Sequence, residues 1–328
     1  MNPFEYVKPS SVDSAIRAKA RAGAAFIGGG TNLLDLMKGE IEHPRTIVDI
    51  NGLGLDRIEL LPDGRLRIGS AARNSDMAAH SEVRTRYPLL VEAIVAGASQ
   101  QLRNMATAGG NLLQRTRCHY FVDTAFERCN KRNPGSGCAA LTGEQRQHAI
   151  FGASDRCIAT NPSDMNVALA ALDATIRVQG PKGERSIPVG DFHRLPGGRP
   201  QVDTTLADDE LILSIDLPEN RCADGSHYLK IRDRASYAFA LVSVAAAMHI
   251  ENGVVSDIRI ALGGVAPKPW RATAVEQQLI GKALTRGAIR EAAKGVVDGS
   301  KAFPGNAFKQ VLLPRAIARA VQVAGAVS

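Results

Sequence analysis

The chain has 328 residues, of which 45% are hydrophobic and 22% are charged. This length allows two or three domains with substantial cores. No stretch approaches the roughly 18 uninterrupted apolar residues of a membrane span, so we predict no membrane insertion. The formal net charge is +7, but Lys and Arg are scattered among 33 acidic residues, and only 5% of residues are aromatic. This pattern favours a solvated basic surface, or a docking face for an acidic partner, over nucleic-acid binding.

The first part of the chain alternates predicted helices and strands. The first helix should begin at Ser10 or Ser11, because serine is a preferred N-cap residue, and Gly23 should end it. The strand, helix and strand that follow it form a compact βαβ unit. In chain order we predict a helix over 10–23, a strand over 24–27, a helix over 32–38, strands over 46–50 and 65–72, helices over 74–81, 88–101 and 163–173, and strands over 174–180 and 210–218.

The pattern changes after residues 220–226, which have the composition of a linker. Beyond them β-rich runs come first and helices last, which is typical of a separate α+β domain. Asn252-Gly253 is a strong hairpin signal between two of the runs. We predict strands within 227–232, 239–250 and 254–265, followed by helices near 271–281, 285–298 and 306–325.

Two glycine-rich segments are candidates for ligand binding. "FIGGGTNLLD" places Gly28, Gly29 and Gly30 between a strand and a helix, and "ATAGGNLLQ" (106–114) is the second segment. Glycine lets backbone amides approach an anion closely, although a tight turn without a ligand would use the same residues. Leu33 stands where the dinucleotide fingerprint has its third glycine, and the chain contains no "GKS" or "GKT". Together the two segments fit a ligand with a long diphosphate and a second hydrogen-bonding region.

Six ordered blocks carry a resemblance to a known family. They are "FIGGGTNLLDLM", "RIGSAARNSDMA", "TAGGNL", "NPSDMNVALAALDA", "DELILSIDLP" and "YLKIRDRASYAFALVSVAAAM". In this order they resemble the FAD-binding subunits of the molybdenum hydroxylases, which include xanthine dehydrogenase, carbon monoxide dehydrogenase and aldehyde oxidoreductases. The resemblance covers essentially the whole chain and implies an α+β fold. Residues 1–220 would form a two-lobed FAD-binding domain of the PCMH/vanillyl-alcohol-oxidase-like type, with lobes of about 1–55 and 56–220. Residues 225–328 would form a CO-dehydrogenase-flavoprotein-like domain with a three-stranded antiparallel sheet and helices.

The resemblance also assigns FAD contacts to individual residues. Asp164 would accept hydrogen bonds from the ribose or the flavin, although it could serve simply as an acid in the first turn of a helix. Asp164, Ile212 and Lys230 would lie toward the ribityl chain and the ring, although Lys230 could instead be a surface lysine. The residues implied to surround the diphosphate and adenosine are Ile27, Gly28, Gly29, Gly30, Thr31, Asn32, Leu33, Leu34, Thr107, Gly109, Gly110, Asn111 and Leu112.

Four of the five cysteines lie between the second glycine-rich segment and Asp164. Cys118, Cys129, Cys138 and Cys157 follow the spacing C-x10-C-x8-C-x18-C, which matches neither a common zinc finger nor the ferredoxin run. By spacing alone they could be buried free cysteines, but they stand in polar turn segments rather than in the apolar surroundings that such cysteines favour.

The cysteine-bearing insert, about residues 114–158, carries a resemblance of its own. It resembles the insert of flavin subunits of bacterial periplasmic aldehyde oxidoreductases, and that of 4-hydroxybenzoyl-CoA reductase. The resemblance implies a [4Fe–4S] cluster on the four cysteines. Nearby basic residues would offset the negative charge of this cluster. Zinc is the first alternative and disulfides the second. His119 and His148 could substitute as ligands, but with four cysteines present they are expected to be ordinary polar residues. Cys222 is expected to take no part. The basic residues are Arg115, Arg117, Arg128, Lys131, Arg132 and Arg156.

The family resemblance predicts an electron-transfer subunit of a heterotrimeric molybdenum-cofactor aldehyde oxidoreductase, with FAD and one [4Fe–4S] cluster as cofactors. No residue of this chain is predicted to be catalytic. The partners would be a molybdopterin-binding large subunit, a [2Fe–2S] small subunit and an external electron acceptor. One alternative is a flavin subunit of the 4-hydroxybenzoyl-CoA reductase type, and another is a non-catalytic scaffold with a zinc site. The start of the chain shows no secretory signal, so we expect a periplasmic location by co-export with a signal-bearing partner, or a cytoplasmic one otherwise.

Overall fold

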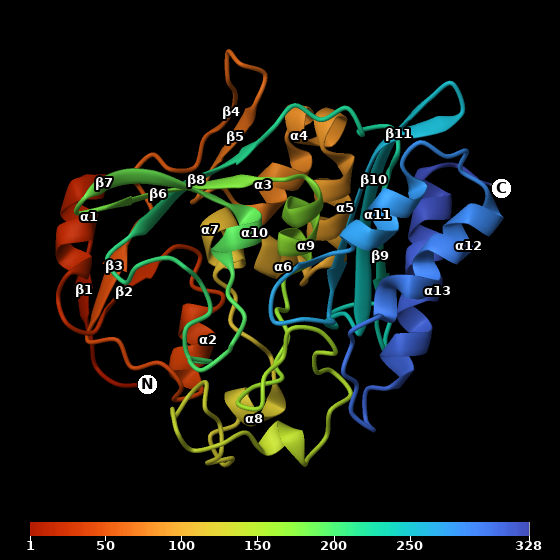
Figure 1. The fold of residues 1–328 in the computed structure, drawn as a ribbon. Coiled ribbons are helices and arrows are strands. Elements are labelled where there is room, and N and C mark those ends of the chain that lie inside the picture. Colours follow the sequence, from red (N-terminus) through yellow and green to blue (C-terminus); the bar gives the residue numbers. More distant parts are fainter. Residues whose placement is uncertain (328) are drawn as a thin grey trace.

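A computed structural model of the chain describes residues 1–327 and has an α+β fold with three β-sheets. Figure 1 shows the sheet formed by the start of the chain at one side and the sheet of the C-terminal part at the other, with short helices packed between them. The loop-rich insert lies along the lower edge of the same view, below both. No helix within residues 1–327 is long and apolar enough to cross a membrane.

The first sheet is parallel and has the strand order β1-β3-β2. The first helix begins after Ser11, whose side chain accepts a hydrogen bond from the backbone N–H of Ser14, and it ends before the predicted stop at Gly23. The helix buries Ala15 and Ile16 in a small core against the sheet. These elements are β1 (Glu5–Val7), α1 (Val12–Lys19), β2 (Ala24–Ile27), α2 (Leu33–Lys38) and β3 (Thr46–Asp49).

The second sheet has five antiparallel strands in the order β4-β5-β8-β6-β7. The helix predicted over 88–101 is divided in two, because Gly97 and Ala98 leave the helical conformation and Ala98 has a φ of 53°. The elements are β4 (Ile58–Leu60), β5 (Leu66–Gly69), α3 (Asn74–Ala79), α4 (Ser81–Arg86), α5 (Pro88–Ala96), α6 (Gln100–Arg103), α7 (Ala108–Leu112), α9 (Asp164–Ala171), β6 (Thr175–Gly180), β7 (Gly183–Pro188), α10 (Val189–Phe192) and β8 (Leu211–Leu217).

The third sheet is antiparallel with the order β12-β11-β10-β9, so it has four strands where three were expected. The fourth, β12, has only two residues, which is too short for a periodic signal. The expected hairpin turn at Asn252-Gly253 is confirmed, and both residues have positive φ. The elements are β9 (Ser226–Ile231), β10 (Val242–Glu251), β11 (Val254–Gly263), β12 (Trp270–Arg271), α11 (Thr273–Leu279), α12 (Arg286–Lys294), a 3-10 turn (Gly295–Val297) and α13 (Phe308–Ala324).

Both faces of the third sheet are buried. Alternate side chains of a strand point to opposite faces, so Ala245, Ala247 and Ala261 join the core formed with α5 and α9. Val244 and Ile260 point the other way, into a core that α11, α12 and α13 cover. Small alanines on the first face let the sheet lie close against the helices. The C-terminal part therefore packs onto the rest of the chain through the middle of its sheet.

The insert has little regular structure. It contains α8 (His119–Val122) and one 3-10 turn (Ala139–Leu141), and turns make up most of the rest. Its last part is fixed to the C-terminal part of the chain, since the backbone N–H of Ile150 donates to the carbonyl of Val265 at 2.8 Å.

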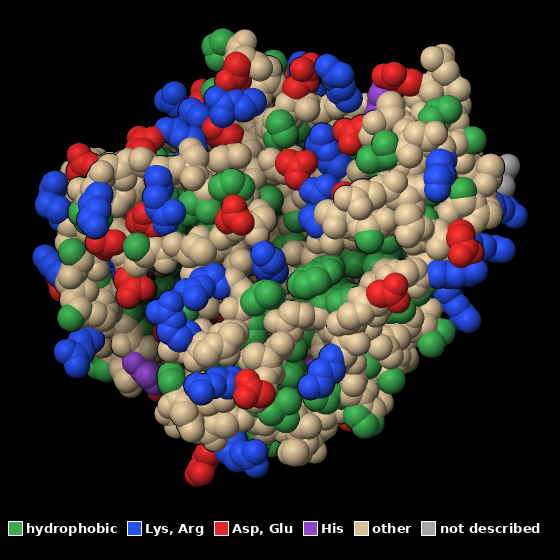
Figure 2. All heavy atoms as spheres, viewed as in Figure 1, with side chains coloured by type: hydrophobic (Ala, Val, Ile, Leu, Met, Phe, Trp, Pro, Cys, Tyr) green, Lys and Arg blue, Asp and Glu red, His purple; other side chains and the backbone are tan. Residues whose placement is uncertain are grey.

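On the face shown in Figure 2, Lys and Arg side chains are interspersed with Asp and Glu.

Candidate functional site

The two glycine-rich segments line the same pocket, which has a volume of about 690 Å³. The first segment contributes the end of β2 and the turn before α2, and the second contributes the start of α7. Nearby charged side chains at its rim are Glu42 and Arg115. The predicted FAD residues among its lining are Ile27, Gly28, Gly29, Gly30, Thr31, Asn32, Leu33, Thr107 and Gly110.

The glycines of the first segment are required by packing between the two segments. A Cβ on Gly29 would overlap the carbonyl oxygen of Met105, and one on Gly28 would come within 2.9 Å of the Thr107 hydroxyl oxygen. At Gly29 we expected a ligand to approach the backbone closely. In the structure it is the chain beside the second segment that approaches Gly29, so packing explains the glycine. Gly30 has a φ of 75°, which side chains other than glycine rarely adopt.

The second segment contains a short helix, α7. Thr107 caps it, because its side-chain oxygen accepts a hydrogen bond from the backbone N–H of Gly110 at 3.2 Å. The side-chain amide of Asn32 donates to the carbonyl of Gly110 at 3.0 Å. The two segments thus form one hydrogen-bonded unit, although they are far apart in the sequence.

A larger cleft of about 1070 Å³ adjoins this pocket and shares Thr31 and Asn32 with it. Asp164 and Lys230 face each other in the cleft, with Oδ2 of Asp164 2.7 Å from Nζ of Lys230. Their side chains are only 8% and 5% exposed, so the structure does not place Lys230 on the surface. The hydroxyl of Tyr228 donates to Oδ1 of Asp164 at 2.7 Å. Burial, followed by the neighbouring carboxylate, raises the pKa of Tyr228 well above its usual value.

Several residues of this cleft were not among the predicted FAD contacts. The guanidinium of Arg117 donates to Asp35 at 2.7 Å and to Asn32 at 2.9 Å, and it lies over the ring of Phe239. Asn74 also lines the cleft, as does Tyr237, which has a φ of 51°. The block containing Tyr237 and Phe239 was visible in the sequence, but nothing in it indicated a turn with positive φ.

Four other predicted FAD residues line neither cavity. Ile212 is 3% exposed in β8 and belongs to the main hydrophobic core. Leu112 is fully buried, and its carbonyl lies 2.9 Å from Nε2 of His193. Gly109 packs against Ser70, and Leu34 packs against Gly30. Asn111, by contrast, lines the larger cleft.

All four cysteines of the insert line one cavity of about 280 Å³. Cys129 and Cys138 are joined by an isolated antiparallel β-bridge, and Cys157 forms a second bridge with Ser154. Burial raises the pKa of the thiols of Cys138 and Cys157, and it raises that of Cys118 to about 12. Within residues 1–327 no three His, Cys, Asp or Glu side chains lie close enough together to hold a single metal ion.

Three of the six basic residues expected beside the cysteines line this cavity, namely Arg128, Lys131 and Arg156. The other three have different partners. Arg115 pairs with Glu42 and Asp203, and Arg132 donates to backbone carbonyls. Arg117 points into the larger cleft, as described above. These three side chains do not line the cavity, because nearness in sequence does not fix the direction of a long side chain, and their effect on the charge of a cluster stays a prediction.

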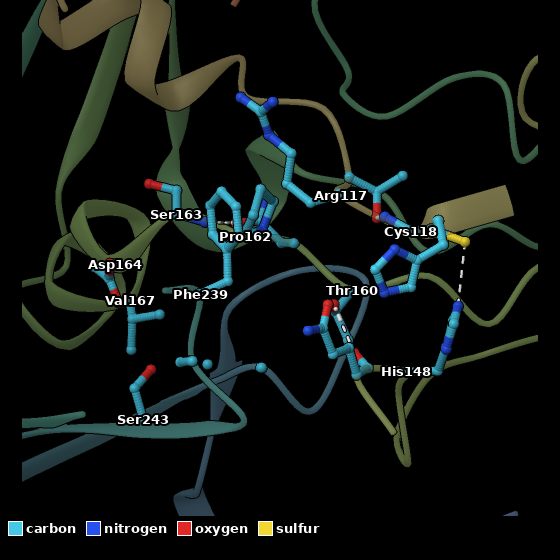
Figure 3. A pocket seen from close by; sticks show the side chains of 17 residues that line it. Arg117, Cys118, His148, Thr160, Pro162, Ser163, Asp164, Val167, Phe239 and Ser243 are labelled. Carbon is cyan, nitrogen blue, oxygen red and sulfur yellow. Dashed lines mark hydrogen bonds between the residues drawn. The ribbon is translucent and has the colours of Figure 1, made fainter. Parts of the chain in front are cut away.

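A third pocket, of about 520 Å³, connects the cleft and the cysteines (Figure 3). It shares Arg117, Asp164 and Phe239 with the cleft, and it shares Cys118 with the cysteine cavity. In Figure 3, Asp164 lies at one end and Cys118 at the other, beside His148. The Sγ of Cys118 is 3.1 Å from Nε2 of His148. Burial lowers the pKa of His148 to about 4.

Comparison with known protein families agrees with this architecture. Residues 2–220 match the model of the FAD binding domain in molybdopterin dehydrogenase. Residues 227–302 match the CO dehydrogenase flavoprotein C-terminal domain. The chain therefore belongs to the family of FAD-binding subunits of the molybdenum hydroxylases, which are oxidoreductases, and the family predicted from the sequence blocks is confirmed.

The chain is also similar to individual proteins of this family. The chain is 54% identical over 282 residues to the aldehyde oxidoreductase FAD-binding subunit PaoB of Escherichia coli, covering 85% of this chain and 86% of the relative. It is 28% identical to the glyceraldehyde dehydrogenase medium chain of Sulfolobus acidocaldarius, covering 89% of this chain and 86% of the relative. Among solved structures, carbon monoxide dehydrogenase from Hydrogenophaga pseudoflava matches with a TM-score of 0.77 and 27% identity, covering 99% of this chain and 98% of that one.

Proposed function

We propose that this chain is the FAD- and [4Fe–4S]-binding electron-transfer subunit of a heterotrimeric molybdenum-cofactor aldehyde oxidoreductase. The observation that carries the proposal is the row of connected cavities that runs from the glycine-rich segments to the four cysteines. Two redox groups in these cavities would be separated by one shared pocket. Aldehyde oxidation itself would occur on a partner, and this chain would pass the electrons to an external acceptor.

The cavities fit FAD. The diphosphate and adenosine would lie along the glycine-rich segments, and the flavin would lie in the larger cleft beside Asp164 and Lys230. Two buried polar atoms of residues lining that cleft, Oδ1 of Asn74 and Nε of Arg117, have no hydrogen-bond partner in the part of the chain that the structure describes. A polar ligand would supply the missing partners, because buried polar groups are rarely left unpaired. When bound, FAD supplies one- and two-electron transfer.

The cysteine cavity fits an iron–sulfur cluster. In a [4Fe–4S] cluster each cysteine binds a different iron atom, so the four sulfurs surround a larger centre than a single zinc ion, which needs sulfurs about 2.3 Å away. Cys118, Cys129, Cys138 and Cys157 all line one cavity, which supports the proposal of such a centre. Lys131 is 8% exposed and lines the same cavity, where its charge would offset that of the cluster.

The relatives support the partners and the substrate class that we propose. The aldehyde oxidoreductase subunit PaoB supports an aldehyde as the substrate class of the complex. We infer a molybdopterin-binding large subunit and a [2Fe–2S] small subunit as partners. Co-export with a signal-bearing partner to the periplasm belongs to the same proposal, with a cytoplasmic complex as the alternative.

Analysis of the purified complex for iron, sulfide and flavin under anaerobic conditions tests the proposal. We expect one FAD per chain, iron in excess of the [2Fe–2S] clusters, and co-purification with a molybdopterin subunit. The isolated chain should show flavin absorption with an overlapping broad iron–sulfur band, and it should oxidise no aldehyde. Zinc in place of the additional iron would support the scaffold alternative. Aldehyde turnover by the isolated chain with an artificial acceptor would contradict the proposed division of roles.

A further inference from the structure

The side chain of His148 points directly at one of the four cysteines. Its Nε2 lies 3.1 Å from the Sγ of Cys118, and Figure 3 shows the two side chains end to end. His148 is only 2% exposed, and its other ring nitrogen, Nδ1, has no hydrogen-bond partner among residues 1–327. Among these described residues, the hydrogen bond to the sulfur of Cys118 is thus the only one that the ring makes.

The direction of this hydrogen bond follows from the chemistry of the sulfur. A cysteine bound to iron is a thiolate and carries no proton. The hydrogen atom between Sγ of Cys118 and Nε2 of His148 must then belong to the imidazole. A donor to a thiolate draws electron density from it and so stabilises the more negatively charged, reduced state of the attached cluster. Hydrogen bonds to the sulfurs are among the factors that set the potential of iron–sulfur clusters.

We propose that His148 is a positioning residue of the [4Fe–4S] site, whose Nε2–H donates to the sulfur of Cys118 and raises the reduction potential of the cluster. This inference rests on the proposed function, since it requires the cluster. It assigns His148 a role beyond that of the ordinary polar residue expected from the sequence.

The backbone of His148 is held in place from the C-terminal part of the chain. Its carbonyl accepts hydrogen bonds from Nζ of Lys309 at 2.9 Å and from the side-chain amide of Asn306 at 3.1 Å. Lys309 is fully buried and also donates to the carbonyl of Gly264 at 2.6 Å. These contacts anchor the segment that carries His148 to α13 and β11. The ring is therefore fixed relative to Cys118, as a donor that acts on one particular sulfur needs to be.

The affected cysteine is the one that faces the flavin side. Cys118 lines both the cysteine cavity and the connecting pocket, and that pocket shares Arg117, Asp164 and Phe239 with the larger cleft. Cys129, Cys138 and Cys157 line the cysteine cavity but not the connecting pocket. The hydrogen bond from His148 thus acts at the side of the cluster from which electrons would pass to or from the flavin.

Potentiometric titration of the purified complex, followed by the EPR signal of the reduced [4Fe–4S] cluster, tests the inference. His148→Phe keeps a ring but removes the donor, and we expect a lower midpoint potential with unchanged iron content. His148→Gln keeps an amide donor and should restore the potential toward that of the wild type. His249→Phe is the control, because His249 lies in β10 and lines neither the cysteine cavity nor the connecting pocket, and its substitution should leave the potential unchanged.

Labelling the histidines of the wild-type complex with ¹⁵N gives a second measurement that does not depend on how the variants fold. A weak nitrogen coupling to the reduced cluster, lost in His148→Phe, supports a hydrogen bond. A strong coupling means that histidine binds iron directly and overturns the inference, as does an unchanged potential in His148→Phe. If the complex shows no [4Fe–4S] signal at all, the result contradicts the proposed function. If the signal is present but its potential is the same in His148→Phe, the result contradicts only the role of His148.

Discussion

The larger cleft and the cysteine cavity lie on either side of the connecting pocket, but different parts of the chain hold them together. The cleft depends on contacts between distant segments, such as the amide of Asn32 with the carbonyl of Gly110, and the pair of Asp164 with Lys230. The cysteine cavity depends on turns within the insert. Nearby backbone groups bond to one another there, as when the N–H groups of Gly135 and Gly137 donate to the side chain of Asn130. Contacts across the whole fold therefore support the cleft, whereas the cysteine cavity relies more on local turns, on a few distant contacts such as that of Lys131 with Asp203 and, by our proposal, on its cluster.

The largest expected effect concerns the cysteines, because local turns alone are not expected to preserve the cavity. Replacing Cys118, Cys129, Cys138 or Cys157 singly with Ser should remove most of the iron of this site and leave FAD bound, since the cleft has its own supports. Iron and flavin content of each purified complex measure this. Cys222→Ser is the control, because Cys222 is also buried but lies outside the insert. Loss of FAD together with iron in all four variants would show that the two sites are not independent.

The second prediction concerns the ion pair of the cleft. Lys230→Met leaves the carboxylate of Asp164 buried without its cation, and removing one partner of a buried pair costs about 3 kcal/mol of unfolding free energy. The variant should also bind less FAD, while its iron content stays unchanged. Chemical denaturation and flavin content measure the two effects. The double variant Asp164→Asn/Lys230→Met removes both charges and should regain much of the stability; if it is no more stable than Lys230→Met, the pair is not the cause.

A third prediction concerns how the free energy of unfolding depends on pH. Burial lowers the pKa of His193, beneath α7, from 6.5 to about 4. The unfolded chain then takes up a proton before the folded one does, so stability is lost as pH falls from about 6.5 to about 4. Between pH 6.5 and 5 the loss due to this group is about 2 kcal/mol. His193→Gln should reduce the loss, and the exposed His119→Gln should not. Denaturation curves at pH 7 and 5 measure it; equal losses in the two variants would contradict it.

The smallest expected effect concerns the cap of α7. Thr107→Val removes the hydrogen bond to Gly110 and should cost about 1 kcal/mol, together with a measurable weakening of FAD binding. Thr285 caps α12 in the same way, through the N–H of Ala288, but lies outside both cavities. Thr285→Val should therefore cost a similar amount of stability without changing FAD affinity, as flavin fluorescence can measure. Equal FAD affinities in the two variants would show that the cap of α7 does not contribute to FAD binding.

Sequence patterns were sufficient where an element buries a periodic apolar face. The helix predicted over 306–325 is α13, and the hairpin at Asn252-Gly253 joins β10 and β11. The short strands β1, β4 and β12 were missed, since two or three residues show no period. The six-residue strand β7 was missed because it is mostly exposed and has no apolar alternation.

Within the candidate site, sequence blocks indicated which segments meet but not where each side chain points. The two glycine-rich segments do lie together, and all four cysteines line one cavity. Arg117 was expected beside the cysteines and instead reaches the cleft, and His148 was not expected at Cys118. Both depend on contacts across more than 25 positions of sequence, which no local spacing encodes.

The two-sided burial of the C-terminal sheet has a consequence for how such proteins can evolve. A chain that ended after β8 would leave α5 and α9 without the alanine-rich face that covers them, so this part of the core would be open to water and prone to aggregation. Recombination at residues 220–226 could therefore exchange C-terminal parts only between relatives whose sheets present equally small side chains, such as Ala245 and Ala261, to those helices. The linker marks a boundary in the sequence, but the parts of the chain on its two sides must change together in evolution.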